Sequence, residues 1–178
     1  MSKVSIIMGS QSDLETVNEA IHVLKEFKVG FEAKVLSAHR APKELAEYVE
    51  AAPKRGTKVF IAAAGGAAAL AGVVASHTTL PVIGIPIETS SLKGLDSLLS
   101  TVQMPGGVPV ASMAIGKAGA KNAALFALAI LGISDKRIGA KLARYKREMR
   151  VKVKNSNIKI QSTKVIPNPK FKTRRFGF

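Results

Sequence analysis

Three features of the sequence predict an α/β fold in which a parallel sheet lies between two layers of helices. Short apolar runs alternate with amphipathic segments along the first 150 residues. Most of the apolar runs lack the in-and-out alternation of a half-exposed strand, which indicates strands that are buried on both faces. The runs are far enough apart for a crossover helix between each pair. Right-handed crossovers then produce a three-layer sandwich with a five-stranded parallel sheet.

Strand and helix segments can be assigned in order along the chain. The predicted strands are KVSIIM (3–8), FEAKVL (31–36), KVFIAAA (58–64), PVIGIPI (81–87) and VPVASMAI (108–115). The predicted helices cover residues 12–27, 42–56, 66–77, 94–104, 118–132 and 135–150. The first of these helices has one apolar face, formed by Leu14, Val17, Ile21, Leu24 and Phe27. Ser12 and Glu15 have the spacing of a capping box at its start.

The helix predicted over residues 118–132 has almost no polar face. A helix that is apolar all round is normally buried on every side. A domain of this size has little core in which to bury such a helix. We therefore expect another subunit to cover part of it, and burial within a tightly wrapped monomer is the alternative.

The composition is that of a globular protein. Of the 178 residues, 47% are hydrophobic and 22% are charged, which argues against a disordered chain. The absence of cysteine excludes disulfides, thiolate metal sites and a cysteine nucleophile. No apolar run approaches the roughly 20 residues that a membrane-spanning helix needs, and the N-terminal run is too short for a cleavable signal. We therefore expect a cytoplasmic protein with no membrane partner.

The net charge of +15 is concentrated at the C-terminal end. Residues 141–178 contain 13 of the 27 lysines and arginines, but a single acidic residue, Glu148. We expect a domain over residues 1–150, followed by a basic extension over residues 151–178 that is extended or disordered. A solvated tail is the expected role of such a block, with contact to an acidic neighbour or RNA as the alternative. Nucleic acid is therefore not expected as a partner, apart from this tail.

Polar and glycine-rich segments follow the predicted strands. In parallel sheets, ligands bind beyond the carboxyl ends of the strands, near the point where the strand order reverses. The segments expected at this rim are GSQSD (9–13), SAHR (37–40), AGGAAA (64–69) and IPIETS (85–90).

The first rim segment, GSQSD, joins a strand to the start of a helix. Gly9 allows a ligand to approach the backbone, and free amides at a helix N-terminus favour an anion. Ser10 and Ser12 add hydroxyl donors, and Asp13 could accept hydrogen bonds from ribose. Simple helix capping by Ser12 or Asp13 is the alternative. The segment matches neither a P-loop nor the dinucleotide-binding fingerprint.

His39 and Arg40 stand together at the end of the second predicted strand. Arginine binds phosphate through two parallel hydrogen bonds and keeps its charge. Histidine titrates near neutral pH and suits general acid–base catalysis. Ordinary loop polarity is the alternative for both. His22 and His77 are expected to be structural, and no spacing of metal ligands appears, so no metal site is expected.

The third rim segment, within AAGGAAALAG (63–72), has almost no functional side chains. Such a loop offers backbone amides and free space. It suits a flat ring or a carboxylate, and tight packing of helix against sheet is the alternative.

Six motifs together resemble one family. They are MGSQSD (8–13), SAHRAP (37–42), AGGAAALAG (64–72), LPVIGIP (80–86), GLDSLLSTVQMPGGVPV (94–110) and NAALFALAIL (122–131). In this order they resemble the class I N5-carboxyaminoimidazole ribonucleotide mutases of de novo purine synthesis, the family of the catalytic subunit of phosphoribosylaminoimidazole carboxylase. The resemblance runs from about residue 3 to residue 150 and leaves out the basic tail.

The resemblance implies a flavodoxin-like domain with a C-terminal helix, assembled as a homo-octamer. It implies conversion of N5-carboxyaminoimidazole ribonucleotide (N5-CAIR) to 4-carboxyaminoimidazole ribonucleotide (CAIR) without a metal or organic cofactor. His39 would transfer the protons, Arg40 would hold the phosphate, and the first loop would hold phosphate and ribose. The expected substrate-binding residues are Ser10, Ser12, Asp13, Ser37, Arg40, Gly65, Gly66, Ala67, Ala69 and Leu70.

One position departs from the family pattern. The glycine–alanine loop of the family usually continues with histidine, leucine and proline, whereas this chain has Ala69, Leu70 and Ala71. A second imidazole beside the carboxylate is therefore missing, which predicts lower activity. Two other functions stay open. One is a carboxylase of the same fold that adds free carbon dioxide to aminoimidazole ribonucleotide. The other is a weakly active or inactive nucleotide-binding assembly.

Overall fold

The computed structural model describes the backbone of residues 2–162 and the side chains of residues 2–156. The strands are β1 (Val4–Met8), β2 (Phe31–Val35), β3 (Val59–Ala64), β4 (Val82–Pro86) and β5 (Ala111–Ser112). The α-helices are α1 (Leu14–Glu26), α2 (Pro42–Ala51), α3 (Leu70–Ser76), α4 (Leu95–Val102), α5 (Gly116–Ser134) and α6 (Lys136–Ser162). Two short 3₁₀ helices, η1 (Gln11–Asp13) and η2 (Ala52–Arg55), adjoin α1 and α2.

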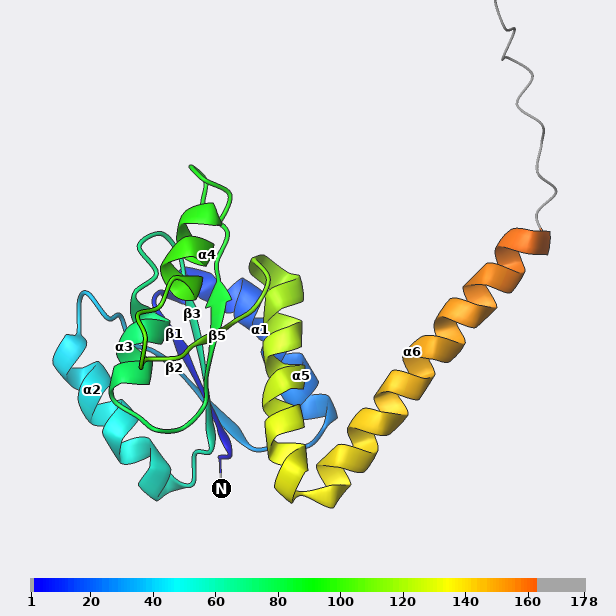
Figure 1. The fold of residues 1–178 in the computed structure, drawn as a ribbon, viewed down its shortest axis with the longest axis horizontal. Coiled ribbons are helices and arrows are strands. Elements are labelled where there is room, and N and C mark those ends of the chain that lie inside the picture. Colours follow the sequence, from blue (N-terminus) through cyan, green and yellow to red (C-terminus); the bar gives the residue numbers. More distant parts are fainter. Residues whose placement is uncertain (1, 163–178) are drawn as a thin grey trace, which may run out of the picture. The chain divides into compact units, whose positions relative to one another are not determined.

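The five strands form one parallel sheet in the order β2-β1-β3-β4-β5. This is the flavodoxin-like order, in which the chain reverses its direction of winding between β1 and β3. Helices α1 and α5 cover one face of the sheet, and α2, α3 and α4 cover the other (Figure 1). The predicted three-layer α/β fold is therefore confirmed.

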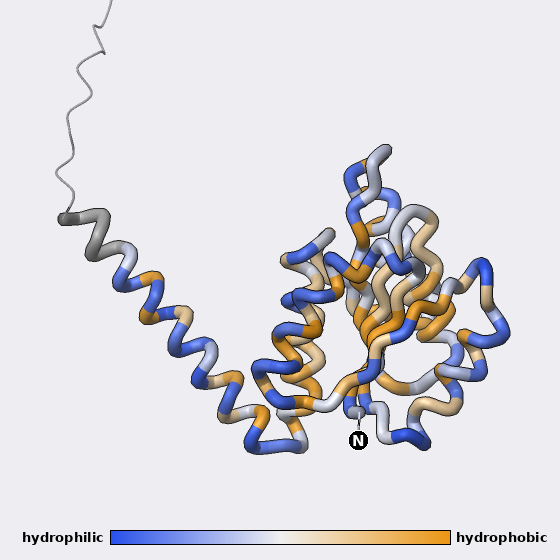
Figure 2. Tube along the Cα trace, turned by 180° about the vertical axis from the view of Figure 1, so that it is seen from behind, coloured by the Kyte–Doolittle hydropathy of each residue, from blue (hydrophilic) through white to orange (hydrophobic). Residues whose placement is uncertain are grey.

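The core lies around the three central strands. All residues of β1 and β4 are buried, and so are five of the six residues of β3. Strand β2 differs, because it lies at the edge of the sheet and its last three residues are exposed. The sequence predicts a strand here but not its place in the sheet, and an edge strand has a neighbour on one side only. Figure 2 shows the apolar centre of the sheet.

Several boundaries differ from the prediction for local reasons. The capping box lies at the start of η1 and is formed by Ser10 and Asp13, not by Ser12 and Glu15. Helix α3 begins at Leu70, because residues 65–69 form a loop in which Gly66 has a φ of +66°. Strand β5 is only two residues long. Residues 105–109 contain two prolines and two glycines, which do not favour a sheet ladder.

Helix α5 packs tightly through its small residues, mainly against α1. Gly119, Ala120, Ala123, Ala124 and Ala127 are buried, and a Cβ atom at Gly119 would collide with the Ala114 carbonyl. The helix is nevertheless not buried all round in the monomer. Phe126 is 42% exposed and Ile133 is 87% exposed. Because these two side chains are exposed, the alternative that a single chain buries the whole helix is excluded.

Helix α6 runs beyond the predicted end of the domain. It continues to Ser162, so residues 151–162 are helical where the sequence predicts an extended or disordered segment. No glycine or proline interrupts the chain between Gly139 and Pro167, and most of the intervening residues tolerate or favour a helix. Residues up to Leu142 belong to one compact unit, and α6 from Ala143 belongs to a second. Residues 163–178 of the predicted tail lie outside the described residues. No helix in the described part of the chain is long and apolar enough to cross a membrane.

Candidate active site

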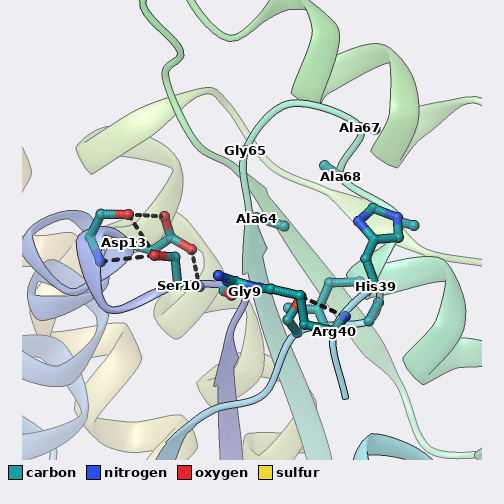
Figure 3. Close-up of a pocket in the computed structure, with 14 residues that line it drawn as sticks. Gly9, Ser10, Asp13, His39, Arg40, Ala64, Gly65, Ala67 and Ala68 are labelled. Atoms are coloured by element: carbon teal, nitrogen blue, oxygen red, sulfur yellow. Dashed lines mark hydrogen bonds between the residues drawn. The ribbon is translucent and has the colours of Figure 1, made fainter. Parts of the chain in front are cut away.

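A cavity of about 400 Å³ opens beyond the carboxyl ends of β1, β2 and β3 (Figure 3). The loops after these strands supply its lining: Gly9, Ser10, Ser12, Asp13, Ser37, Ala38, His39, Arg40, Ala64, Gly65, Ala67, Ala68, Ala69 and Leu70. Nine of the ten predicted substrate-binding residues and His39 therefore meet at one cavity. The fourth rim segment, residues 85–90, does not line it.

The loop after β1 is held by hydrogen bonds within itself. The Ser10 amide donates to Asp13 Oδ2 at 3.0 Å, and the Ser12 hydroxyl donates to Ser10 Oγ at 2.9 Å. Asp13 is only 5% exposed, and burial raises its pKa against the lowering effect of hydrogen bonds from the Ser10 amide and the Ser12 hydroxyl to its carboxylate and of the Arg40 charge. The capping role that the sequence left as an alternative is therefore present, and Ser10 shares it with Asp13.

Arg40 joins the second loop to the first. Its guanidinium donates to the Gly9 carbonyl at 2.8 Å, and its amide donates to Ser37 Oγ at 3.3 Å. A guanidinium has five N–H donors. The contact to Gly9 is the one hydrogen bond that this side chain makes to the described residues, so donors remain for an anion at the exposed mouth.

His39 is exposed and lines the same cavity. Its ring makes no hydrogen bond to any residue between 2 and 156, so both nitrogens are accessible to a ligand. In Figure 3 the imidazole lies on the side of Ala68, whereas Ser10 and Asp13 lie on the opposite side of the view. His39 and the loop after β1 thus lie at different ends of the cavity.

The loop after β3 forms an apolar wall. Ala67 is exposed to the cavity, Ala69 is half-buried, and Leu70 is buried at the start of α3. Gly66 is the exception among the predicted residues, because it does not line the cavity. Gly66 has a left-handed backbone, and its amide donates a hydrogen bond to a side chain of α4. This contact directs Gly66 away from the cavity, where the sequence predicts it.

That side chain is Ser97, which the sequence analysis did not single out. Ser97 is fully buried, accepts a hydrogen bond from the Gly66 amide at 3.0 Å, and donates one to the Ile87 carbonyl at 2.8 Å. The loop after β4 thus supports the cavity from behind. A serine within the apolar pattern of GLDSLLS was the available signal, but its partners are 31 and 10 residues away.

Replacement of Ser97 by alanine is expected to lower the free energy of unfolding and to make the loop after β3 less ordered. The Gly66 amide and the Ile87 carbonyl would lose their partner, which typically costs about 1–3 kcal/mol when the groups are buried. We expect a lower midpoint of thermal unfolding, together with a reduced turnover number. Calorimetry and steady-state kinetics measure the two effects. Ser100→Ala, at an exposed position of the same helix, is the matched control, and an equal effect of both changes would contradict the role of Ser97.

The other two histidines lie away from the cavity. His22 is exposed on α1, and His77 Nδ1 lies 3.0 Å from Glu50 Oε1. Within residues 2–156, no group of three or more histidine, aspartate or glutamate side chains is placed to hold a metal ion.

Comparison with known proteins places these features in one family. The model of the AIR carboxylase family matches residues 3–152. N5-carboxyaminoimidazole ribonucleotide mutase of Saccharolobus solfataricus is 56% identical over 150 residues, which are 84% of this chain and 94% of the relative. The mutase of Bacillus subtilis is 58% identical over 139 residues, 78% of this chain and 86% of the relative.

A solved structure agrees with both the fold and the sequence relationship. The crystal structure of Treponema denticola PurE has a TM-score of 0.80 and 28% identity, and the match covers 88% of this chain and 96% of that one. The family match includes all three loops that form the cavity. The chain therefore belongs to the AIR carboxylase family.

Proposed function

We propose that the protein is an N5-carboxyaminoimidazole ribonucleotide mutase, which converts N5-CAIR to CAIR in purine synthesis. The observation that carries the proposal is the meeting of His39 and Arg40 with the loop after β1 at one cavity. Relatives that bear this name are 50–58% identical over most of the chain.

The phosphate end of the cavity uses Arg40 and the first loop. The guanidinium has donors left after its contact to Gly9, and Ser10 and Ser12 line the same cavity. A charged donor with a planar fork holds a phosphate in one orientation. The ribose would then lie near Asp13, and the ring would extend toward the alanine loop.

His39 would transfer two protons in opposite directions. As an acid, it protonates the exocyclic nitrogen of N5-CAIR, and the carbon–nitrogen bond breaks to release carbon dioxide. The ring carbon then attacks the carbon dioxide, and a carbon–carbon bond forms. As a base, His39 removes the proton that this ring carbon still carries. The imidazole returns to its starting state, so a single group suffices for the cycle.

The apolar wall limits the escape of carbon dioxide. Ala67, Ala68 and Leu70 offer no hydrogen bonds from their side chains to water. A released molecule held beside the ring reacts at a high effective concentration, whereas one in bulk solvent is diluted.

An assay on the purified protein tests the proposal. We expect CAIR to form from N5-CAIR without added bicarbonate, and little product from aminoimidazole ribonucleotide. Rapid, bicarbonate-dependent conversion of aminoimidazole ribonucleotide would instead assign the carboxylase function. No conversion of either substrate, with binding retained, would leave a nucleotide-binding assembly.

We also propose that residues 1–150 act in the cytoplasm as the mutase domain of a homo-octamer. Helix α4 and its preceding loop support an assembly, because Leu92, Leu95, Leu99 and Val102 are each about half exposed on one face. Monomers seldom expose such a contiguous apolar patch. Light scattering is expected to give about 150 kDa, eight times the 18.8 kDa chain. A stable monomer would contradict the proposal.

Replacement of Ala69 by histidine is expected to raise turnover by about 10-fold or more, the lower end of what a positioned acid–base or hydrogen-bonding group contributes. Ala69 lines the cavity and stands at the start of α3. An imidazole there would hydrogen-bond the migrating carboxylate and fill cavity space that the methyl group of Ala69 leaves open.

Steady-state kinetics on both forms measure the effect. The Michaelis constant should change less, because the phosphate contacts lie in other loops. Ala67→His adds the same ring at a neighbouring lining position and serves as the control. A folded, substrate-binding Ala69→His variant that is no faster than the parent would show that this protein does not use an imidazole at position 69.

A further inference from the structure

Helix α6 carries an excess of positive charge that the proposed reaction does not use. Its fully described stretch, residues 143–156, contains six cationic side chains and one acidic one. The acid, Glu148, pairs with Arg144 at 2.7 Å. The other five cations are Lys146, Arg147, Arg150, Lys152 and Lys154, and none has an ion-pair partner among residues 2–156.

Three of these cations form one exposed row. Arg147, Arg150 and Lys154 stand at positions i, i+3 and i+7 of a continuous helix, so they share one face. We call this row the basic face. Its charges extend over about 10 Å at the rise of an α-helix. Lys154 shares this face with the two arginines because α6 continues beyond residue 150. Figure 2 shows that hydrophilic residues dominate the coloured part of this helix.

The relatives indicate that the end of α6 is not needed for the shared chemistry. The family match ends at residue 152, within the basic face. The match to the Saccharolobus solfataricus mutase leaves out 16% of this chain but only 6% of the relative, since it covers 84% and 94% of the two. Most of the unmatched chain is thus additional to what that relative has.

We infer that α6 is a docking surface for the phosphate backbone of a double-stranded nucleic acid. A duplex carries about one negative charge per 1.7 Å of its axis, so phosphates are dense enough to meet every cation of the basic face. Arginine and lysine contacts to phosphates supply affinity without reading sequence. Residues 143–156 contain a single aromatic residue, the half-buried Tyr145, so the stacking platforms typical of single-strand binding are missing from this stretch.

Two other occupants fit the helix less well. Two basic faces carry charges of the same sign and repel each other, so the basic face does not pair with its own copy in the proposed assembly. A lipid surface favours helices with tryptophan, phenylalanine or leucine on the apolar face. The exposed large apolar side chains of α6 within residues 143–156 are Met149, Val151 and Val153. None of them is of the kind that a lipid surface favours.

Fluorescence anisotropy with the full chain tests the inference. The probes are random-sequence duplexes of about 20 base pairs, as RNA and as DNA, titrated between about 50 and 200 mM salt. We expect the variant R147Q/R150Q/K154Q to bind at least about 10-fold more weakly than the parent, with a slope of log affinity against log salt that is smaller by about 2–3. The RNA and DNA arms identify which duplex is preferred.

The control variant K25Q/K54Q/K58Q removes the same charge from exposed positions of the first compact unit. It should bind nearly as the parent does. Glutamine favours a helix almost as well as lysine and arginine do, and circular dichroism checks that α6 persists. Mutase activity of R147Q/R150Q/K154Q should be unchanged, which separates this inference from the proposed function.

Three results with the duplex probes would overturn the inference. The first is a full chain that binds neither duplex at low salt. The second is an equal loss of affinity in both triple variants, which would show that only total charge matters. The third is unchanged binding by R147Q/R150Q/K154Q, which would place the contact elsewhere in the chain. Tighter binding to phosphatidylserine vesicles, weakened by the same three changes, would replace the nucleic acid by a lipid surface.

Discussion

Replacement of His39 by asparagine is expected to lower mutase turnover by about 10²–10⁴-fold, while substrate binding changes little. Proton transfer by a positioned side chain typically contributes a factor of this size. Asparagine keeps much of the shape of histidine but cannot exchange protons at neutral pH. The binding contacts should survive, because Arg40 and the loop after β1 are held by their own hydrogen bonds.

Steady-state kinetics and isothermal titration of the same preparations separate the two effects. His22→Asn is the matched control, since His22 is exposed on α1 and does not line the cavity. It should retain full activity. If His39→Asn stays within a few-fold of the parent, His39 is not the proton-transfer group.

Replacement of Arg40 by alanine is expected to raise the Michaelis constant by roughly 10- to 150-fold. A lost hydrogen bond to a charged group costs about 1.5–3 kcal/mol, which corresponds to that range of affinity. The turnover number at saturation should fall less, because the proposed proton-transfer group is unchanged. Part of the effect would come from the Gly9 carbonyl, which loses its 2.8 Å contact.

Two further variants distinguish phosphate binding from general charge. Arg40→Lys keeps the charge but not the planar fork, so an intermediate Michaelis constant is expected. Lys43→Ala removes a nearby exposed charge that does not line the cavity and should have little effect. An unchanged Michaelis constant in Arg40→Ala would show that another group holds the phosphate.

The fold class and much of the cavity could be predicted because their causes are local in the sequence. The buried strands Val59–Ala64 and Val82–Pro86 lack polar alternation, and this property does not depend on the neighbours that they finally meet. His39 and Arg40 lie in the loop that follows a strand, so their place at the rim of the sheet follows from the end of that strand. The resemblance to a family then identified which rim residues to combine.

The sequence by itself determined the alternation of strands and helices, the rim motifs and the position of the basic block. Only the tertiary structure decided which of these parts meet. Strand β2 is exposed because strand order puts it at an edge, and Gly66 leaves the cavity because Ser97, 31 residues away, captures its amide. Contacts of this kind join residues that are far apart in the sequence. They depend on how whole helices and strands are arranged in space, which no local pattern of residues specifies.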